Sequence, residues 1–174
     1  LRTGISNVFL NLTTVDSIVN GFLQGKPKAG GTDLARVLIN TTVGIGGLID
    51  VAAKAGLNYQ EEDLGQTLAV VGVSRTRFFY IPLLGPSTVR DVPGVAVRSA
   101  IPRLLLGGAY KWWMSGIDTL NSRAEALTLT DTRDSTALDP YAFTREAYYQ
   151  RRKFLIYDGD PPVDDFFDEF DEDF

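Results

Sequence analysis

The chain has 174 residues, of which 44% are apolar and 22% charged, and these values are those of one folded domain with a buried core. It contains no histidine and no cysteine, which excludes Ser-His-Asp and Cys-His catalytic systems and zinc sites built on imidazole or thiolate. P-loop, dinucleotide-binding and EF-hand patterns do not occur in the sequence either, so we expect no cofactor and no metal ion.

The net charge of −5 is unevenly divided along the chain. Nine acids and no base follow Tyr157, so residues 1–157 hold 13 acids against 17 Lys and Arg. We therefore expect a helical body, 1–157, and a disordered acidic tail, 158–174. The alternative for the tail is a short motif that docks on a basic partner through its four phenylalanines. The small positive excess of the body argues against a nucleic acid partner.

Hydrophobic residues at three- and four-residue steps predict helices through most of the body. A first helix is expected over 5–12, and a second short one should begin near Asp16 and end at Gly25. Thr32 is a favourable N-cap for a third helix over 33–42. The residues expected to form the buried face of this third helix are Leu34, Val37, Leu38 and Thr41.

Gly44, Gly46 and Gly47 should separate that helix from a short one over 48–55, because glycine weakens a helix and permits left-handed turns. The stretch 37–49 carries no charge. Its 13 residues are nevertheless too few to cross a bilayer as a helix, which takes about 20 residues. If this protein meets a membrane, we expect it to do so as a monotopic body or through a covalent anchor.

The middle of the chain changes character. A short helix is expected over 64–71, followed by an aromatic-rich extended connection over 75–86 with no recognisable strand alternation. Ser87 should cap a brief helix that contains Arg90 and Asp91, and a further short element is expected over 94–100 between two prolines.

The longest regular element is expected over 104–129, where apolar residues recur every three or four positions. Asp139 followed by Pro140 combines an N-cap with a proline in the first turn, which predicts a last helix ending near Ile156. Asp139 is therefore interpreted as a cap and not as a catalytic acid. The sequence predicts an all-α fold of short, glycine-interrupted helices and one long helix.

Six phrases of the sequence resemble, in their order and spacing, those of the MlaA (VacJ) lipoproteins: RTGISNVFLNL, VNGFLQGKP, RVLINTTVGIGGLIDVA, EEDLGQTLAVVGV, IPLLGPSTVRD and DPYAFTREAYYQRR. The resemblance covers about residues 2–157 and does not extend to the acidic tail. The family's signal peptide, lipidated cysteine and first helices have no match in these residues. We therefore expect a lipid anchor at a residue outside this chain.

The resemblance implies a monotopic, ring-like helical body in the inner leaflet of a Gram-negative outer membrane, facing the periplasm. It implies association with a trimeric outer-membrane porin. It also implies that phospholipid which has strayed into the outer leaflet passes through an amphipathic channel to a soluble periplasmic carrier, so that lipid asymmetry is maintained. No bond is made or broken in this process, so the resemblance implies no enzymatic activity.

Two groups of residues are candidates for this function. The candidates for the channel or for steering an anionic headgroup are Gly44, Gly46, Gly47, Lys54, Arg90 and Arg98. The candidates for contact with the membrane or a porin are Phe78, Phe79, Tyr80, Trp112 and Trp113. The alternative roles are structural: tight packing for the glycines, solvation or ion pairing for the cations, and core packing for the aromatic residues.

Two other functions stay open at this point. A periplasmic scaffold that binds a porin without conducting lipid would share the exposed aromatic residues but would need no polar channel. A hydrolase using carboxylates such as Asp50 and Asp91 would need two acids that converge in one cleft.

Overall fold

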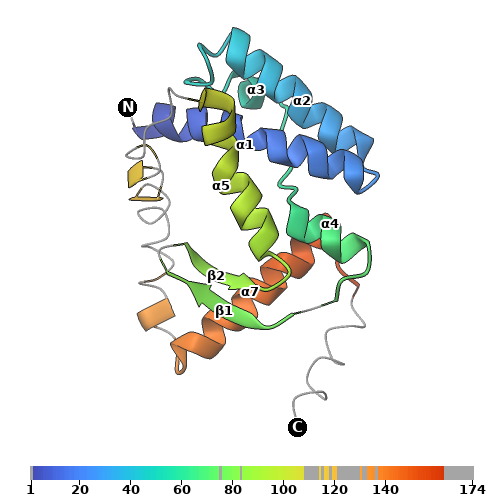
Figure 1. The fold of residues 1–174 in the computed structure, drawn as a ribbon, viewed down its shortest axis with the longest axis vertical. Helices are drawn as coiled ribbons and strands as arrows, with labels where there is room; N and C mark the ends of the chain where they lie inside the picture. The colour runs from blue at the N-terminus through green and yellow to red at the C-terminus, as the bar shows by residue number, and fades with distance from the viewer. Residues whose placement is uncertain are drawn as a thin grey trace.

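The computed structural model describes residues 2–74, 76–82, 84–107, 114, 116–117, 119–120, 130, 133–135 and 137–162. Its elements are α1 (Arg2–Leu23), α2 (Pro27–Thr42), α3 (Val51–Lys54), α4 (Leu64–Val70), β1 (Phe78–Ile81), β2 (Gly85–Thr88), α5 (Val92–Leu106) and α7 (Pro140–Ile156). The fold is mostly helical, which confirms the expected class. Figure 1 shows α1 and α2 side by side at one end of the molecule and α7 with the hairpin toward the other.

The first helix is continuous from Arg2 to Leu23, so the expectation of two short helices is wrong. Asp16 lies inside α1 and begins no helix. Its Oδ1 accepts a hydrogen bond of 2.9 Å from the side chain of Asn20, one turn later. The hydroxyl of Thr14 donates to the carbonyl oxygen of Leu10, one turn earlier, at 2.6 Å. These hydrogen bonds are made within the helix, so the polar side chains do not interrupt it.

The second helix begins at Pro27, ahead of the expected start, because proline fits the first turn of a helix. Thr32 is therefore no cap, and its hydroxyl donates to the carbonyl oxygen of Lys28. The expected buried face is also wrong, since Leu34 is 43% and Leu38 is 58% exposed. The residues of α2 that are buried are Gly30, Asp33, Arg36 and Asn40. The helix thus turns its polar side inward.

The interior of the described part is mostly polar. Among its apolar residues other than glycine and proline, only Phe9, Ala52 and Ile101 are buried. The buried polar and charged residues are Asn11, Thr14, Asp16, Ser17, Asn20, Asp33, Arg36, Asn40, Glu62, Gln66, Thr67, Ser87, Thr88, Asp91 and Arg152. This distribution reverses that of a water-soluble globular core. No helix within the described ranges combines the length and the apolar character that spanning a bilayer requires.

Residues 78–88 contain an antiparallel hairpin that the sequence pattern did not reveal. Phe78 pairs with Thr88 and Ile81 with Gly85. Strands of four residues are too short to show a clear alternation of polar and apolar side chains. Ser87, expected to cap a helix, is instead buried in β2.

The helix α5 is longer than the element expected over 94–100 and runs from Val92 to Leu106, with Pro102 inside it. It ends at Gly107, whose φ of 51° favours glycine. The helix expected over 104–129 therefore does not begin at its predicted start. Most of its remaining residues lie outside the described part of the chain, as do residues 163–174 of the tail.

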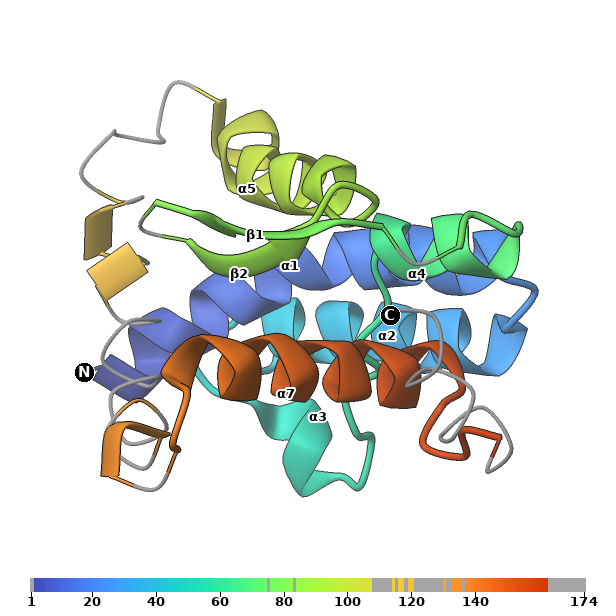
Figure 2. The same cartoon turned by 90° about the horizontal axis from the view of Figure 1, so that it is seen from below.

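The predicted last helix is confirmed at both ends, because α7 spans Pro140–Ile156. Asp139 is its N-cap, and Oδ1 accepts from the backbone N–H groups of Tyr141 and Ala142. The helix expected over 64–71 is confirmed as α4. Figure 2, seen from below, shows α7 in the foreground beneath the hairpin and α4, both of which it contacts.

Candidate functional site

Arg152 of α7 is the centre of a buried charge network. Its guanidinium binds Asp63 in a bidentate arrangement, with Nη1 2.6 Å from Oδ2 and Nη2 2.9 Å from Oδ1. Nη2 also donates to Oδ1 of Asp91 at 3.1 Å. The hydroxyls of Thr88 and Tyr148 each donate to Oδ2 of Asp91 at 2.7 Å. The network therefore joins the starts of α4 and α5, strand β2 and helix α7.

The acids of this network are held ionised. Burial alone would raise the pKa of Asp91, but the charge of Arg152 and the hydrogen bonds from Tyr148 and Thr88 hold that pKa below its ordinary value. Gly65 allows the side chains of Asp91 and Arg152 to lie close to the backbone of α4. A Cβ atom at this position would lie 2.3 Å from Oδ1 of Asp91 and 2.8 Å from Nη2 of Arg152. These contacts make the network a structural junction.

Asp50 and Asp91 do not form the converging pair that a carboxylate hydrolase needs. Asp50 caps α3, and its two oxygens accept from Arg36 Nη2 at 2.8 Å and from Asn40 Nδ2 at 2.9 Å. Asp91 belongs to the network around Arg152. The pKa of each carboxyl lies below its ordinary value despite burial, because arginine charge and hydrogen bonds favour the ionised form. Neither is poised as a general acid, and this removes the structural basis of the hydrolase hypothesis.

The three candidate glycines all serve the turn between α2 and α3. A Cβ atom at Gly44 would lie 2.3 Å from the carbonyl oxygen of Ile49, and one at Gly47 would lie 2.9 Å from Cβ of Asn11. Gly46 and Gly47 have φ values of 67° and 91°, which L side chains rarely adopt. Close packing and turn geometry thus account for these glycines, and their role beside a channel stays a prediction.

The three candidate cations lie in different surroundings, and no contact among the described residues joins them. Lys54 is exposed at the end of α3. Arg90 is engaged, with Nε 3.1 Å from Oδ1 of Asp91. Arg98 of α5 is half-buried, and its Nη1 lies 3.4 Å from the hydroxyl of Tyr59. Of the three, only Arg98 combines burial with the lack of a carboxylate at ion-pair distance within the described part of the chain.

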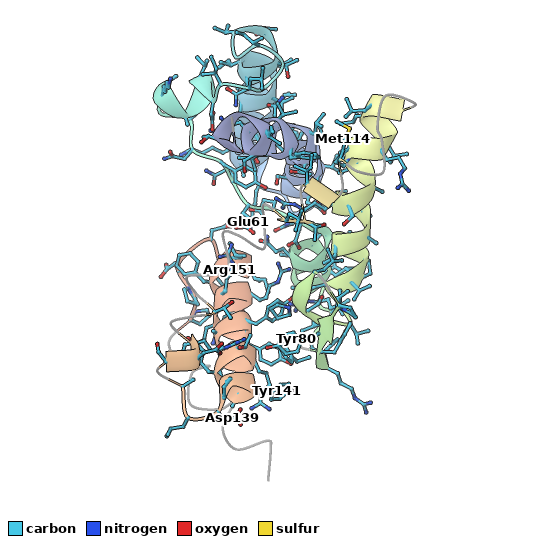
Figure 3. The ribbon with its side chains drawn as sticks, turned by 90° about the vertical axis from the view of Figure 1, so that its left-hand side faces the viewer. Glu61, Tyr80, Met114, Asp139, Tyr141 and Arg151 are labelled. Atoms are coloured by element: carbon cyan, nitrogen blue, oxygen red, sulfur yellow. The ribbon has the colours of Figure 1, made fainter. Side chains whose placement is uncertain are left out.

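Phe78 is the centre of an aromatic cluster between β1 and α7. Its ring centroid lies 5.4 Å from that of Tyr80 and 5.7 Å from those of Tyr141 and Tyr148, in edge-on arrangements. Such pairs add to the stability that burial alone provides. Figure 3 shows Tyr80 and Tyr141 close together near the start of α7, and Arg151 close to Glu61 near its end.

The aromatic candidates separate into three groups. Phe78 packs within the hairpin cluster, so its surroundings favour a structural role. Phe79 is 37% and Tyr80 is 42% exposed, so both remain candidates for contact with a membrane or a porin. Trp112 and Trp113 lie outside the described residues.

Buried acceptors without donors, which the sequence analysis missed, occur in α1, α2 and α4 and in the residues next to α1 and α4. The buried side-chain oxygen atoms that accept no hydrogen bond in the described part are Asp16 Oδ2, Gln24 Oε1, Asp33 Oδ2, Glu62 Oε2 and Gln66 Oε1. Burial raises the pKa of Asp16 and of Asp33 to about 6. The four-residue spacing of Asp16, Asn20 and Gln24 was the available signal, because it places polar groups on one side of a helix.

The outer surface of α1 and α2 is uncharged over long stretches. Asp16 is the only charged residue over 3–25, and Asp33 and Arg36 are the only ones over 29–49; all three are at most 3% exposed. We call the surrounding exposed side chains, which are between 41% and 66% exposed, the apolar coat: Val19, Phe22, Leu23, Leu34, Leu38, Val43, Ile45, Leu48 and Ile49. Exposed apolar side chains in this number, on helices without exposed charge over these ranges, indicate contact with lipid or protein.

The fold and its surface thus define a helical protein with a polar interior and an apolar coat. Comparison with known proteins gives the family. The family model described as MlaA lipoprotein matches residues 1–155, and the chain belongs to this family.

Two relatives are the intermembrane phospholipid transport system lipoproteins MlaA of Shigella flexneri and of Escherichia coli (strain K12), each 36% identical over 166 residues. The protein of the same description from Haemophilus influenzae is 30% identical over 164 residues. The first two alignments cover 91% of this chain and 64% of each relative, so the chain spans about two thirds of their length.

A solved structure described as "Structural basis for maintenance of bacterial outer membrane lipid asymmetry" has the same fold, with a TM-score of 0.73 and 35% sequence identity. The superposition covers 89% of this chain and 79% of that one. The likeness therefore extends over nearly the whole body described above.

Proposed function

We propose that this chain is the lipid-handling body of an outer-membrane lipoprotein in an intermembrane phospholipid transport system. It removes phospholipid that has strayed into the outer leaflet, conducts it through an amphipathic channel, and passes it to a soluble periplasmic carrier. It works beside a trimeric porin, in the inner leaflet and facing the periplasm, and is anchored by a lipid at a residue outside this chain. Family membership and the descriptions of the relatives support this proposal.

The observation that carries the proposal is the reversal of polarity in α1 and α2. A large aliphatic side chain gains about 1.5–3 kcal/mol when it leaves water completely. Nine such groups in the apolar coat forgo much of this gain in water, and recover it in hydrocarbon. The uncharged coat therefore favours a helical pair that lies in one leaflet, while the polar interior offers partners to a phosphate-bearing headgroup.

The proposed function assigns different roles to two parts of the chain. Residues 1–157 form the lipid-handling body, and residues 158–174 are an acidic tail that this body does not need for folding. Within the body, Arg98 is the best-placed cation for an anionic headgroup, because its guanidinium is half-buried and lies within ion-pair distance of no described carboxylate. Gly44, Gly46 and Gly47 shape the turn that borders the apolar coat.

A second candidate function is a scaffold that binds a porin without conducting lipid. The exposed Phe79 and Tyr80 on the hairpin favour a protein contact at that edge, since aromatic residues are enriched at interfaces. This function needs the aromatic edge of the molecule but makes no use of the polar interior.

The test is complementation in a Gram-negative deletion strain of this family. The chain is expressed behind the signal peptide and lipidation segment of a relative, and outer-leaflet phospholipid is measured by its accessibility to a surface-acting lipid-modifying enzyme. In parallel, the purified protein is analysed for co-purified phospholipid by mass spectrometry. A lowered surface signal together with bound phospholipid is the expected result.

A protein that reaches the outer membrane, binds no phospholipid and leaves the surface signal unchanged would overturn the transport proposal and favour the scaffold. The control is an expression level matched to the native relative, so that an unchanged signal is not due to scarce protein.

A further inference from the structure

Arg98 of α5 and Asp16 of α1 are opposite charges that influence one another's pKa without forming an ion pair. The hydroxyl of Tyr59 links the two helices, because it lies 2.9 Å from Oγ of Ser17 and 3.4 Å from Nη1 of Arg98. Ser17 directly follows Asp16 on α1. The two helices pack against one another, as Figure 1 shows where α5 passes α1.

Asp16 has one satisfied and one unsatisfied oxygen. The residue is 3% exposed, Oδ1 accepts from Asn20, and Oδ2 accepts no hydrogen bond within the described part of the chain. Burial raises its pKa to about 6, the charge of Arg98 opposes this rise, and the charge of Asp63 at the start of α4 adds to it. A buried carboxylate oxygen of this kind lacks a donor, and a cationic donor would satisfy it best.

Arg98, in turn, is a donor with few acceptors among the described residues. Burial alone would lower its pKa, but the Tyr59 hydroxyl and the charges of Glu61 and Asp16 favour the charged form. Its single described hydrogen bond is the long one to Tyr59. A guanidinium presents five N–H donors and suits a phosphate, so most of its binding capacity is unused by the described residues.

We propose that Arg98 and Asp16 together recognise a zwitterionic phosphoethanolamine headgroup, with the phosphate at the Arg98 guanidinium and the ammonium at Oδ2 of Asp16. This inference rests on the proposed function and names the class of phospholipid that the body prefers. Phosphatidylglycerol offers the phosphate but no ammonium, so it makes only the contact with Arg98.

The experiment measures binding of phosphatidylethanolamine and phosphatidylglycerol with identical acyl chains to the purified protein in detergent, by native mass spectrometry. Wild type should prefer phosphatidylethanolamine about tenfold, as expected of one hydrogen bond between charged groups. Asp16→Asn keeps the Oδ1 acceptor for Asn20 but removes the charge, and should lower phosphatidylethanolamine binding to the level of phosphatidylglycerol. Arg98→Gln should weaken the binding of both lipids.

The matched control is Asp33→Asn. Asp33 is likewise a buried acid with one unsatisfied oxygen, but it lies on α2 and its Oδ1 accepts from the backbone of Gln60. The lipid preference of the Asp33→Asn variant should equal that of wild type. The preference of wild type should also decline as the pH falls through about 6, since Asp16 then loses its charge, whereas Asp16→Asn should show no such decline.

Soluble sn-glycero-3-phosphoethanolamine tests whether the protein recognises the free headgroup or only the headgroup of an intact lipid. Competition by this compound shows that the headgroup alone is recognised, and a lipid preference without competition shows that acyl chains are needed as well; both support the site. Equal binding of the two lipids by wild type, or an unchanged preference in Asp16→Asn, overturns the inference while leaving phospholipid transport intact. Binding of neither lipid overturns the proposed function itself.

Discussion

Charged side chains are placed differently in the pair α1 and α2 and in the helix α7. The pair buries all three of its charged residues over 3–25 and 29–49 and exposes its apolar coat. In α7, by contrast, the Arg151 side chain is 66% exposed and makes a surface ion pair, while Arg152 next to it is buried in the charge network. This difference is what the proposed function requires, with α1 and α2 facing lipid and α7 having one side in water.

The largest effect is expected from Arg152→Met, which removes the charge that α7 contributes to the interior. Asp63 and Asp91 would then remain buried without their counter-charge, and breaking a buried ion pair in this way costs about 3–5 kcal/mol. The melting temperature in detergent should drop sharply. The control is Arg151→Met, one residue earlier, whose exposed ion pair with Glu61 is expected to contribute about 1 kcal/mol or less. Equal losses in the two variants would contradict the network's importance.

Gly65→Ala tests the same junction from the side of α4. The added Cβ would collide with Asp91 Oδ1 and Arg152 Nη2, and overpacking of this kind costs about 1–3 kcal/mol. Gly31→Ala in α2 is the matched control, because a Cβ there meets nothing within 4 Å. That variant should gain up to about 1 kcal/mol from the higher helix propensity of alanine. Denaturation of both proteins in the same detergent measures the difference.

Asp33→Asn tests the cost of burying a carboxylate in α2. Burial raises the pKa of Asp33 from 3.8 to about 6 in the folded protein, so folding disfavours its ionised form. The free energy of unfolding is therefore highest when the pH is below 3.8, where the acid is protonated in both states, and it decreases as the pH rises through about 6. The variant should therefore be more stable than wild type at pH 8, by at most about 3 kcal/mol. The advantage should shrink by about half at pH 5. Thermal unfolding at both values checks this, and a pH-independent difference would speak against the ionised acid as the cause.

Leu38→Glu tests the apolar coat directly. Leu38 is 58% exposed in the uncharged part of α2, so a carboxylate there should weaken association with phospholipid vesicles about tenfold while changing stability in detergent little. Vesicle flotation is the measurement. Phe143→Glu on α7, where the side chain is 47% exposed, should bind vesicles as wild type does. If both variants lose binding equally, the two regions do not differ in the way proposed.

The sequence predicted both α4 and α7. For α7 the signals were the capping Asp139 and the helix-starting Pro140, which act within a few residues. The orientation of α2 could not be predicted in the same way. The period of its apolar residues defines an apolar and a polar face. Which face turns inward depends on the medium around the protein, and the prediction was wrong because it placed the apolar face inward, as in a protein surrounded by water. The continuity of α1 was missed because Asp16 was interpreted as the start of a helix.

The candidate site was predicted less completely than the fold. Arg98 was recognisable as a cation, but its environment depends on Tyr59, which is 39 positions away in the sequence. Ion pairing was the structural alternative for the candidate cations, and Arg90 is paired with Asp91, its neighbour in the chain. Contacts such as Arg152 with Asp91, 61 positions apart, leave no local trace that a single sequence shows.

The charge network also has a consequence for the order of folding. Arg152 meets Asp63 across 89 positions, and Lys26 meets Asp158 across 132, so neither contact exists until the last helix has been synthesised. Closing loops of this length costs more conformational entropy than forming local turns. The Arg152 network can therefore form only after α7 is complete, whereas the contacts of α1 with α2 and with α5 need no residue of α7.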